Sequence, residues 1–362
     1  MRSGIGDALQ ASRRRMARLI RVPGGLAKSS THGGDEASPP MDELLTDFHA
    51  GRTRALARAI SLCEAGRGAD LIRAVYAQTG RALTIGLTGP PGVGKSTLCS
   101  ALVAFVRRQG KTVGVISVDP SSPFSHGALL GDRIRLTEHF VDPDVFIRSM
   151  ASRGHLGGVS GATADAVSLM DAFGKDVIIV ETVGVGQSEI EIAEIADTTL
   201  VALQPGSGDS VQVLKAGILE IADVFVVNKS DHPMALQLQR EVRSMMEMLQ
   251  FSGWVPALVA TQAVSGKGID ALWEAVLDHD RYLKTTGEIA EKRRAAYAHR
   301  VRALALGVLE TRIERELETL DAASDPYAGA RELLERFGIY GAVAASGNTA
   351  ARSAVRATVK GL

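Results

Sequence analysis

Short runs of apolar residues recur through the middle of the chain, and amphipathic stretches separate most of them. The apolar runs lie at residues 83–87, 112–118, 145–147, 177–180, 199–203, 224–227 and 257–260. Between them, apolar residues recur at helical spacing in residues 97–108, 163–172, 211–219, 235–249 and 269–279. Continuous apolar strands that alternate with helices are typical of a parallel sheet covered on both faces. The pattern therefore predicts an α/β fold, a mostly parallel twisted sheet flanked by helices.

Helical patterns without strands lie on both sides of this region. Residues 41–78 contain two or three predicted helices, with a joint at Gly66 and Gly68. Residues 288–321 and 325–337 form a second predicted helical region. We therefore divide the chain into a disordered or targeting tail (1–40), an N-terminal helical extension (41–80), the sheet domain (81–283), a C-terminal helical arm (284–340) and an unassigned tail (341–362).

Composition and charge narrow the class of protein. The chain has 362 residues, a formal net charge of +0 and two cysteines, Cys63 and Cys99. A neutral chain offers no global attraction for nucleic acid, and isolated cysteines favour a reducing compartment over a disulfide framework. No apolar run is long enough to span a bilayer. We therefore expect no nucleic-acid partner, no membrane span and a cytoplasmic location.

Residues 1–40 leave the compartment open. Arg13, Arg14 and Arg15 lie among apolar residues, and sequence rich in Gly, Ser and Pro follows up to Pro40. This composition is that of a disordered tail, but an Arg-rich start poor in acidic residues is also typical of an organellar transit peptide. A transit peptide would direct the chain to an organelle instead of the cytoplasm.

A phosphate-binding loop is predicted where the first apolar run meets the first sheet-domain helix. The segment GPPGVGKST satisfies G-x-x-x-x-G-K-[ST], follows a strand and opens a helix. Its glycines let backbone N–H groups point at phosphate oxygens, and the helix N-terminus adds a favourable dipole. Lys95 would bridge the β- and γ-phosphates, and the Ser96 hydroxyl would bind Mg²⁺. The predicted contacts are Gly89, Pro90, Pro91, Gly92, Val93, Gly94, Lys95, Ser96 and Thr97.

A guanine-reading motif, NKSD, directly follows the apolar run 224–227. The Asp231 carboxylate can accept hydrogen bonds from N1–H and the 2-amino group of guanine. Adenine offers neither donor at that position, and the unpaired polar group that it would leave is costly. A backbone N–H after the next strand would reach guanine O6. The predicted base contacts are Asn228, Lys229 and Asp231, with Gln262, Ala263 and Val264. We therefore expect GTP and GDP as ligands.

Three carboxylates are candidates for a magnesium site with Ser96. Asp119 ends the apolar run 112–118, and Glu181 ends the run 177–180. Both would project from the carboxyl edge of the sheet, where ligands bind in such folds. Asp132 lies in the loop between them, and its spacing alone leaves a metal ligand and a loop cap equally open. Mg²⁺ is held by few protein carboxylates together with phosphates and water, which this set could supply.

Two glycine-rich segments beside the predicted phosphate edge are candidate switches. The first, residues 181–189, contains Gly184, Gly186 and Gln187, and the second covers residues 204–215. Loops held by the γ-phosphate and Mg²⁺ switch on hydrolysis, although ordinary strand–helix connections look alike in sequence. Val185 follows Gly184, where a water-positioning glutamine is familiar. We therefore expect slow intrinsic GTP hydrolysis that a partner stimulates.

Taken together, several long motifs closely resemble those of the methylmalonyl-CoA mutase-associated GTPases, which are MeaB-like in bacteria and have a mitochondrial counterpart in the cobalamin A complementation group. The resemblance covers residues 41–330 and rests on GLTGPPGVGKST, VDPSSPFSHGALLGDRIRL, FIRSMASRGHLGG, VETVGVGQSEIEIA, PGSGD and IADVFVVNKSD. It implies a P-loop GTPase that guards an adenosylcobalamin-dependent mutase of the methylmalonyl-CoA type, gates cofactor loading and helps remove inactivated cofactor. It also implies a homodimer formed through the C-terminal arm, and a cobalamin adenosyltransferase as a further partner.

The resemblance also assigns individual residues. Asp119, Asp132 and Glu181 match the family's metal-region acids, and Arg135 matches an arginine near the phosphates. With Lys95, the residues Glu181, Asp119 and Arg135 form the expected catalytic set. Asp209 and Lys215 match the loop that signals to the mutase. His126 departs from the family's first switch, and Gln262 stands where a serine is common.

Three other functions stay open. A nickel- or cobalt-delivering metallochaperone GTPase would need a Cys/His metal site or a His-rich tract, and the two cysteines here are isolated. A small-molecule kinase, a label once given to this family, would need an acceptor site that the sequence does not reveal. A GTP-dependent scaffold that never turns over is a third possibility.

Overall fold

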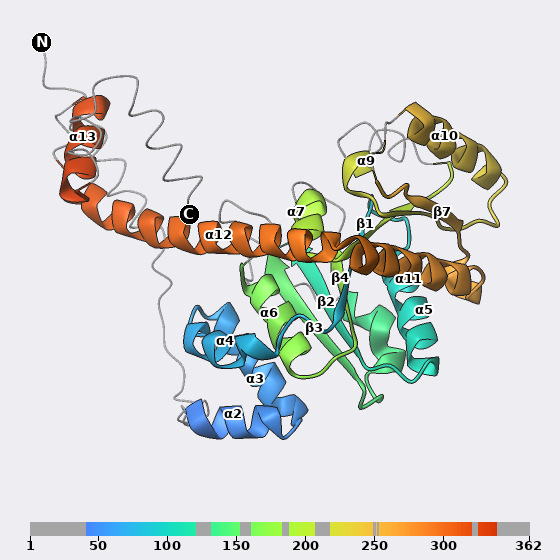
Figure 1. Ribbon diagram of the computed structural model, residues 1–362, viewed down its shortest axis with the longest axis horizontal. Coiled ribbons are helices and arrows are strands. Elements are labelled where there is room, and N and C mark those ends of the chain that lie inside the picture. Colours follow the sequence, from blue (N-terminus) through green and yellow to red (C-terminus); the bar gives the residue numbers. More distant parts are fainter. Residues whose placement is uncertain are drawn as a thin grey trace, which may run out of the picture. The chain divides into compact units, whose positions relative to one another are not determined.

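The computed structural model of the chain describes residues 41–120, 132–152, 161–182, 188–206, 218–248, 251, 253–320 and 325–338. The chain divides into two units, Met1–Pro40 and Met41–Leu362, and all described residues belong to the second. Their centre is a seven-stranded sheet in the order β3-β2-β4-β1-β5-β6-β7. Every pairing in it is parallel. The predicted α/β fold, a parallel sheet flanked by helices, is confirmed (Figure 1).

The strands follow the apolar runs of the sequence. They are β1 (Leu83–Thr88), β2 (Val113–Pro120), β3 (Val145–Ser152), β4 (Val177–Thr182), β5 (Thr198–Leu203), β6 (Val224–Val227) and β7 (Ala257–Ala260). The helices before and within the sheet region are α2 (Met41–His49), α3 (Thr53–Glu64), α4 (Ala69–Val75), η1 (Tyr76–Gln78), α5 (Lys95–Arg108), η2 (Asp132–His139), α6 (Gly161–Ala172), α7 (Ser188–Ile195), α9 (Ile218–Ile221) and α10 (Ala235–Met248). The remaining ones are η3 (Ala263–Ser265), α11 (Ile269–Thr286), α12 (Glu288–Leu317) and α13 (Pro326–Arg336).

Three hydrophobic clusters cover the two faces of the sheet. On one face, Ile85 and Leu87 of β1 pack with residues of α5 and α11, such as Leu98 and Leu272. On the other face, β2 and β4 pack against α3, α4, α6 and α7, and β5 and β6 pack against α10. Since both faces are buried, the strands read as continuous apolar runs, which explains why the sequence reveals them.

The N-terminal helices contribute to the second cluster directly. Leu56 and Ile60 of α3 are fully buried in the same cluster as Met170 of α6 and Ile178 of β4. The buried carboxylate of Asp171 accepts hydrogen bonds from the backbone N–H of Ala82 at 2.9 Å and of Arg81 at 3.2 Å. The segment entering β1 is therefore fastened to α6. The division of the chain at residue 80 stays a prediction.

Helix α7 is a difference from the sequence analysis, which predicted no helix between the runs 177–180 and 199–203. Its sequence, SEIEIAEI, alternates charged and apolar residues with the period of a strand, and this hides the helix. Gly86 of β1 allows the helix to approach closely, because a Cβ there would lie 2.9 Å from Ile192 Cγ1 and 3.0 Å from Ala196 Cβ. Helix α11 also runs beyond the predicted end at His279, to Thr286.

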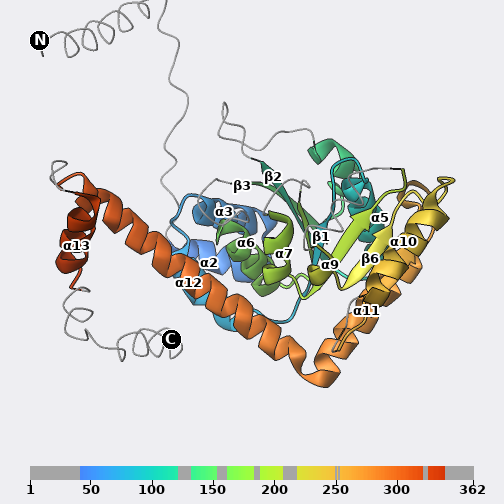
Figure 2. The same ribbon diagram turned by 90° about the horizontal axis from the view of Figure 1, so that it is seen from above.

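Helix α12 begins after Gly287, whose φ of 82° turns the chain from α11, and passes α7 and α6 (Figure 2). No residue of α12 is buried. Within the described ranges, no helix combines the length and the apolar character that crossing a bilayer requires. The helix is held instead by charged side chains near its start.

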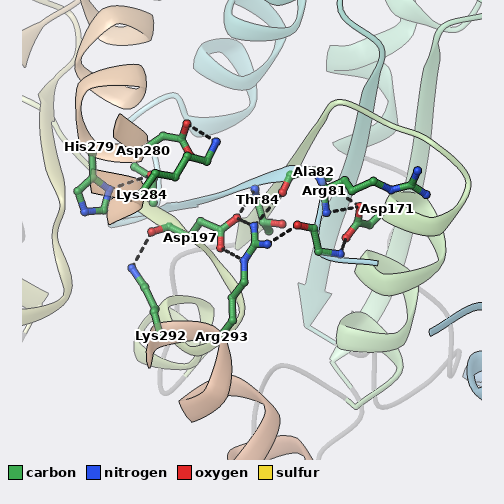
Figure 3. A network of polar contacts seen from close by, with 12 residues as sticks. Arg81, Ala82, Thr84, Asp171, Asp197, His279, Asp280, Lys284, Lys292 and Arg293 are labelled. Carbon is green, nitrogen blue, oxygen red and sulfur yellow. Dashed lines mark hydrogen bonds and ion pairs between the residues drawn. The ribbon is translucent and has the colours of Figure 1, made fainter. Parts of the chain in front are cut away.

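Lys292 and Arg293 bind α12 to the amino ends of three strands (Figure 3). The Arg293 guanidinium donates to both carboxylate oxygens of Asp197, each at 3.0 Å, to Ala82 O at 3.2 Å and to Gly80 O. Asp197, which is buried before β5, also accepts from Thr84 N of β1 at 3.0 Å. Lys292 Nζ donates to Asp197 O at 2.7 Å and to Asp223 Oδ2, before β6, at 3.2 Å. The hydrogen bonds to Asp197 hold the pKa of Arg293 above its usual value.

We predict that Arg293→Ala lowers the free energy of unfolding by about 1–3 kcal/mol, because it leaves the Asp197 carboxylate buried without its charged partner. This range is below that for a fully buried pair because the Arg293 side chain is 37% exposed. Denaturant unfolding of the variant measures the loss. Arg294→Ala is the matched control, because Arg294 is exposed on the same helix. Equal unfolding midpoints for the two variants would contradict the prediction.

Candidate functional site

The phosphate loop of the sequence lies between β1 and α5 at the carboxyl edge of the sheet. Gly89 has a φ of 138°, and a Cβ there would lie 2.2 Å from Ala202 O of β5, so only glycine fits. Gly94, with a φ of 91°, is the N-cap of α5. The loop thus turns tightly over the end of the neighbouring strand and directs the first N–H groups of α5 outward. Such a helix start is a ready anion site.

Lys95, the first residue of α5, lies back over this loop. Its side chain is buried, and Nζ donates to Gly89 O at 2.7 Å and to Pro90 O at 3.1 Å. The ammonium is therefore held above the curve of the loop by backbone carbonyls. Phosphate oxygens bound in the loop would meet a charge that is already in place.

Ser96 and Glu181 form the best-defined polar pair of the site. The Ser96 hydroxyl donates to Glu181 Oε1 at 2.7 Å, and both side chains are buried. Glu181 lies near the end of β4, and its Cα is in register with Leu87 of β1 and Ser117 of β2. Burial raises the pKa of the neighbouring Cys99 thiol, and the Glu181 carboxylate raises it further. A buried carboxylate beside a hydroxyl at a phosphate loop is a donor set of oxygens only, which suits Mg²⁺.

Asp119, Asp132 and Arg135 lie on elements beside this pair. Asp119 is the second-to-last residue of β2, two positions beyond Ser117. Strand β2 is hydrogen-bonded to β4. Asp132 begins η2, and Arg135 lies within it. The side chains of these three residues lie outside the described part of the structure, so their roles stay predictions.

Asn228 joins the phosphate loop to the predicted guanine side. Its side chain is buried, and Nδ2 donates to Val93 O at 2.9 Å. Its Oδ1 accepts from Thr261 Oγ1 and from the Ala263 backbone N–H, each at 3.2 Å. The Ala263 N–H belongs to the segment 261–263, which we expected to supply a backbone donor to guanine O6, and it binds Asn228 here. One amide connects the loops that follow β1, β6 and β7.

The other predicted base contacts lie around this amide. Lys229 has a φ of 55°, the one positive value for a non-glycine residue in the described part of the chain, and its Nζ donates to Gly92 O at 2.9 Å. Asp231 and Val264 are exposed, as expected of side chains that would meet a ligand. Gln262 is half-buried and its backbone pairs with Lys267, which closes the turn that carries Ala263 and Val264.

The predicted switch residues Gly184, Gly186, Gln187, Asp209 and Lys215 lie outside the described residues, as does His126. The structure does bring together the phosphate loop, Ser96 with Glu181, and the 228–231 segment on one edge of the sheet.

A further polar cluster near the site carries no motif in the sequence. Ser100 Oγ of α5 lies 2.9 Å from His139 Nε2 and also donates to the Glu138 carboxylate. His139 Nε2 lies 3.1 Å from Ser100 O. Since Glu138 and His139 end η2, this cluster fastens η2 to the helix that follows the phosphate loop. Only the tertiary fold brings residues this far apart in sequence into contact.

The arrangement can hold a nucleoside triphosphate at one edge of the sheet. In such a complex the glycine loop and Lys95 would face the phosphates, the Ser96–Glu181 pair would face a metal ion, and the 228–231 and 262–264 segments would face the base. The ammonium, hydroxyl, carboxylate and backbone groups of this set are suited to binding phosphate oxygens and a metal ion, so the chemistry that the set favours is phosphoryl transfer by positioning and charge.

Comparison with known proteins agrees with this geometry. The family model described as methylmalonyl Co-A mutase-associated GTPase MeaB matches residues 56–318. A putative GTPase of Pyrococcus horikoshii is 45% identical over 311 residues, which are 82% of this chain and 98% of that protein. The mouse protein named methylmalonic aciduria type A homolog, mitochondrial, is 35% identical over 292 residues, 75% of this chain and 70% of that protein.

A solved structure extends the similarity to the fold. The crystal structure titled LAO/AO transport system kinase aligns with a TM-score of 0.62 and 28% identity, and the alignment covers 82% of this chain and 97% of that one. The family model covers most of the chain, including the phosphate loop, Glu181 and NKSD. The chain is therefore a guanine-nucleotide-binding GTPase and belongs to the methylmalonyl-CoA mutase-associated GTPase family, MeaB.

Proposed function

We propose that the chain is a GTP-dependent chaperone that protects an adenosylcobalamin-dependent mutase of the methylmalonyl-CoA type and gates the loading of its cofactor. The observation that carries this proposal is the match of residues 56–318 to a family described by its association with that mutase. The name of the mouse relative, which refers to methylmalonic aciduria, supports the same partner. The GTP site would then control another enzyme's cofactor instead of making a product of its own.

In this proposal the nucleotide occupies the carboxyl edge of the sheet. The glycines of residues 89–94 and the ammonium of Lys95 hold the phosphates, and Asp231 reads guanine N1–H and the 2-amino group. Asn228 acts indirectly, because its amide is occupied by Val93, Thr261 and Ala263 and so fixes the loops that carry the contacts.

Mg²⁺ fits the residues present. Ser96 and Glu181 would hold it, and Asp119 and Asp132 are further proposed ligands. When bound, the ion neutralises charge on the β- and γ-phosphate oxygens. Lys95 and Arg135 add positive charge from the protein, Lys95 from above the loop and Arg135 from η2. Glu181 also holds the Ser96 hydroxyl in position.

Hydrolysis by the isolated chain is slow in this proposal. Val185 stands after Gly184 in the sequence, and a valine side chain cannot orient a water molecule by hydrogen bonding. The mutase complex would supply the missing positioning, through the first switch with Gly184, Gly186 and Gln187 and through the loop with Asp209 and Lys215. A cobalamin adenosyltransferase is a further proposed partner, because it would deliver the cofactor whose loading is gated. We propose a bacterial cytoplasmic location, or the mitochondrial matrix if residues 1–40 form a transit peptide.

The C-terminal arm supports a homodimer. Tyr297, Val301, Leu304 and Val308 of α12 are large, exposed apolar residues. Their spacing of four, three and four residues places them along one side of the helix. A stripe of this kind on a helix with no buried residue is suited to a second copy of the same helix.

We predict that Asp231→Asn weakens GTP binding about 100-fold and makes xanthosine triphosphate the better ligand. The amide would donate to the xanthine 2-oxo group, whereas it meets the guanine 2-amino group with its own NH₂. Titration with fluorescent nucleotides measures both affinities. The control Asp42→Asn changes an exposed aspartate on α2 and leaves both affinities within about twofold. Unchanged preference for GTP in Asp231→Asn would remove Asp231 as the base reader.

We predict that an adenosylcobalamin-dependent mutase of the methylmalonyl- or isobutyryl-CoA type co-purifies with the chain in the presence of a non-hydrolysable GTP analogue and raises its GTP turnover about tenfold or more. Lys95→Ala, which removes the ammonium over the phosphate loop, is the control that loses both effects.

The alternatives give different results in the same experiment. Absence of nucleotide-dependent association with either mutase would overturn the proposed function. Labelled phosphate transferred to arginine would favour a small-molecule kinase, and nucleotide-dependent release of nickel or cobalt would favour a metallochaperone. Binding of GTP without any turnover, even with the mutase, would leave a scaffold.

We predict that the double change Leu304→Glu and Val308→Glu converts a dimer to a monomer without loss of folding, because it places charges on an exposed stripe. Sedimentation velocity measures the mass. Leu236→Glu, at an exposed leucine of α10, is the matched control and stays dimeric. A monomeric wild-type chain at micromolar concentration would contradict the dimer.

A further inference from the structure

The ammonium of Lys229 has a second partner besides the phosphate loop. Its Nζ donates to Gln204 Oε1 at 2.6 Å as well as to Gly92 O at 2.9 Å. Gln204 directly follows β5, so it comes from a different strand than either the phosphate loop or the NKSD segment. Three loops therefore meet at one ammonium group.

Backbone hydrogen bonds fix the conformation of the chain around Lys229. Asn228 N donates to Leu203 O at 2.9 Å, Ser230 N to Thr261 O at 2.9 Å, and His232 N to Lys229 O at 3.0 Å. These bonds hold residue 229 in its left-handed conformation, with a φ of 55°. A non-glycine residue pays for that conformation, which indicates that the position of its side chain matters.

The Gln204 side chain also lies near Gly92 of the phosphate loop. A Cβ placed on Gly92 would lie 3.8 Å from Gln204 Nε2. Two residues on, a Cβ placed on Gly206 would lie 3.3 Å from His232 Cε1. The segment 204–206 therefore lies close to the loop after β1 and to the loop after β6, and a side chain added at Gly92 or Gly206 would meet these neighbours.

A hydrogen bond to an ammonium group is stronger than one between neutral groups, and it fixes a flexible side chain. Lysine carries a long, flexible stem, and ordering it costs conformational entropy that partners must offset. With Gly92 O alone, Lys229 would have one partner in the described part of the site. Gln204 supplies the second partner, and it directly follows the buried strand β5.

We propose that Gln204 is a positioning residue for the guanine-nucleotide site: it holds Lys229 against the phosphate loop, and thereby keeps the base-reading and phosphate-binding loops at a fixed separation. The inference deepens the nucleotide site on which the proposed function rests, and it does not depend on the mutase. Gln204 itself need not contact the nucleotide.

The test is a titration of purified, full-length variants with fluorescent GDP. Gln204→Ala raises the dissociation constant about five- to tenfold. Gln204→Glu keeps an acceptor for the ammonium, so at low ionic strength it binds GDP more tightly than Gln204→Ala does, and this difference shrinks at high salt. Gln237→Ala on α10, whose Nε2 donates to Glu241 at 2.9 Å, is the matched control and changes the constant less than about twofold.

The decisive measurement is a double-mutant cycle with Lys229→Met, which keeps the stem and removes the ammonium. Adding Gln204→Ala to Lys229→Met has no further effect if Gln204 acts through Lys229. The proposal is overturned if Gln204→Ala lowers the affinity for GDP equally in the wild-type and Lys229→Met proteins. It is also overturned if Gln204→Ala binds GDP as tightly as wild type does. Should Lys229→Met bind too weakly for titration, the salt response of Gln204→Glu decides: behaviour identical to Gln204→Ala at every ionic strength also overturns it.

These outcomes are separable from those of the proposed function. Because the titration contains no mutase, Gln204 can fail as a positioning residue while the mutase still associates and stimulates turnover. Equally, the mutase can fail to associate while the cycle between Gln204 and Lys229 shows full coupling.

Discussion

The buried amide of Asn228 is the interaction on which the nucleotide edge depends. Its Nδ2 binds Val93 O of the phosphate loop, and its Oδ1 accepts from Thr261 and Ala263 after β7. An amide has both donors and acceptors, and no apolar side chain of its size could satisfy groups of both kinds. Loss of this side chain would leave Val93 O and Ala263 N–H buried and unpaired, which costs far more than the net value of the bonds. The Asn228 amide thus sets the separation of the phosphate-binding and base-reading loops, although it need not contact the phosphates or the base of the nucleotide.

Much of the fold could be predicted from local pattern, for a physical reason. Both faces of the sheet are covered, so β1, β4 and β6 are continuous apolar runs that no amphipathic helix would show. Helix α5 could be placed because the phosphate loop must precede it. Helix α7 could not, since its Glu–Ile alternation has the period of a strand and its helical form depends on packing against Gly86. The order of the strands was also beyond the sequence, because apolar runs do not specify which neighbours pair.

The same distinction applies to the candidate site. Residues whose function requires a fixed spacing along the chain, such as those of GPPGVGKST and NKSD, could be found because a loop of that shape needs those residue types in that order. Contacts between distant segments could not be found. Ser100 with His139, Asn228 with Val93, and Gln204 with Lys229 each join two loops or helices that only the fold brings together. A serine, a histidine or a glutamine in isolation has many more common roles than these.

Strand β5 has residues with important polar contacts directly before it and directly after it. All of its residues are buried. Directly before the strand, Asp197 accepts hydrogen bonds from Arg293 and Lys292 of α12. Directly after it, Gln204 accepts a hydrogen bond from Lys229. In between, Ala202 O faces Gly89 so closely that no side chain fits there. A strand paired on both sides and packed on both faces cannot shift without breaking many backbone hydrogen bonds at once. The start of α12, the phosphate loop and the guanine-reading segment are therefore all positioned against the same rigid strand.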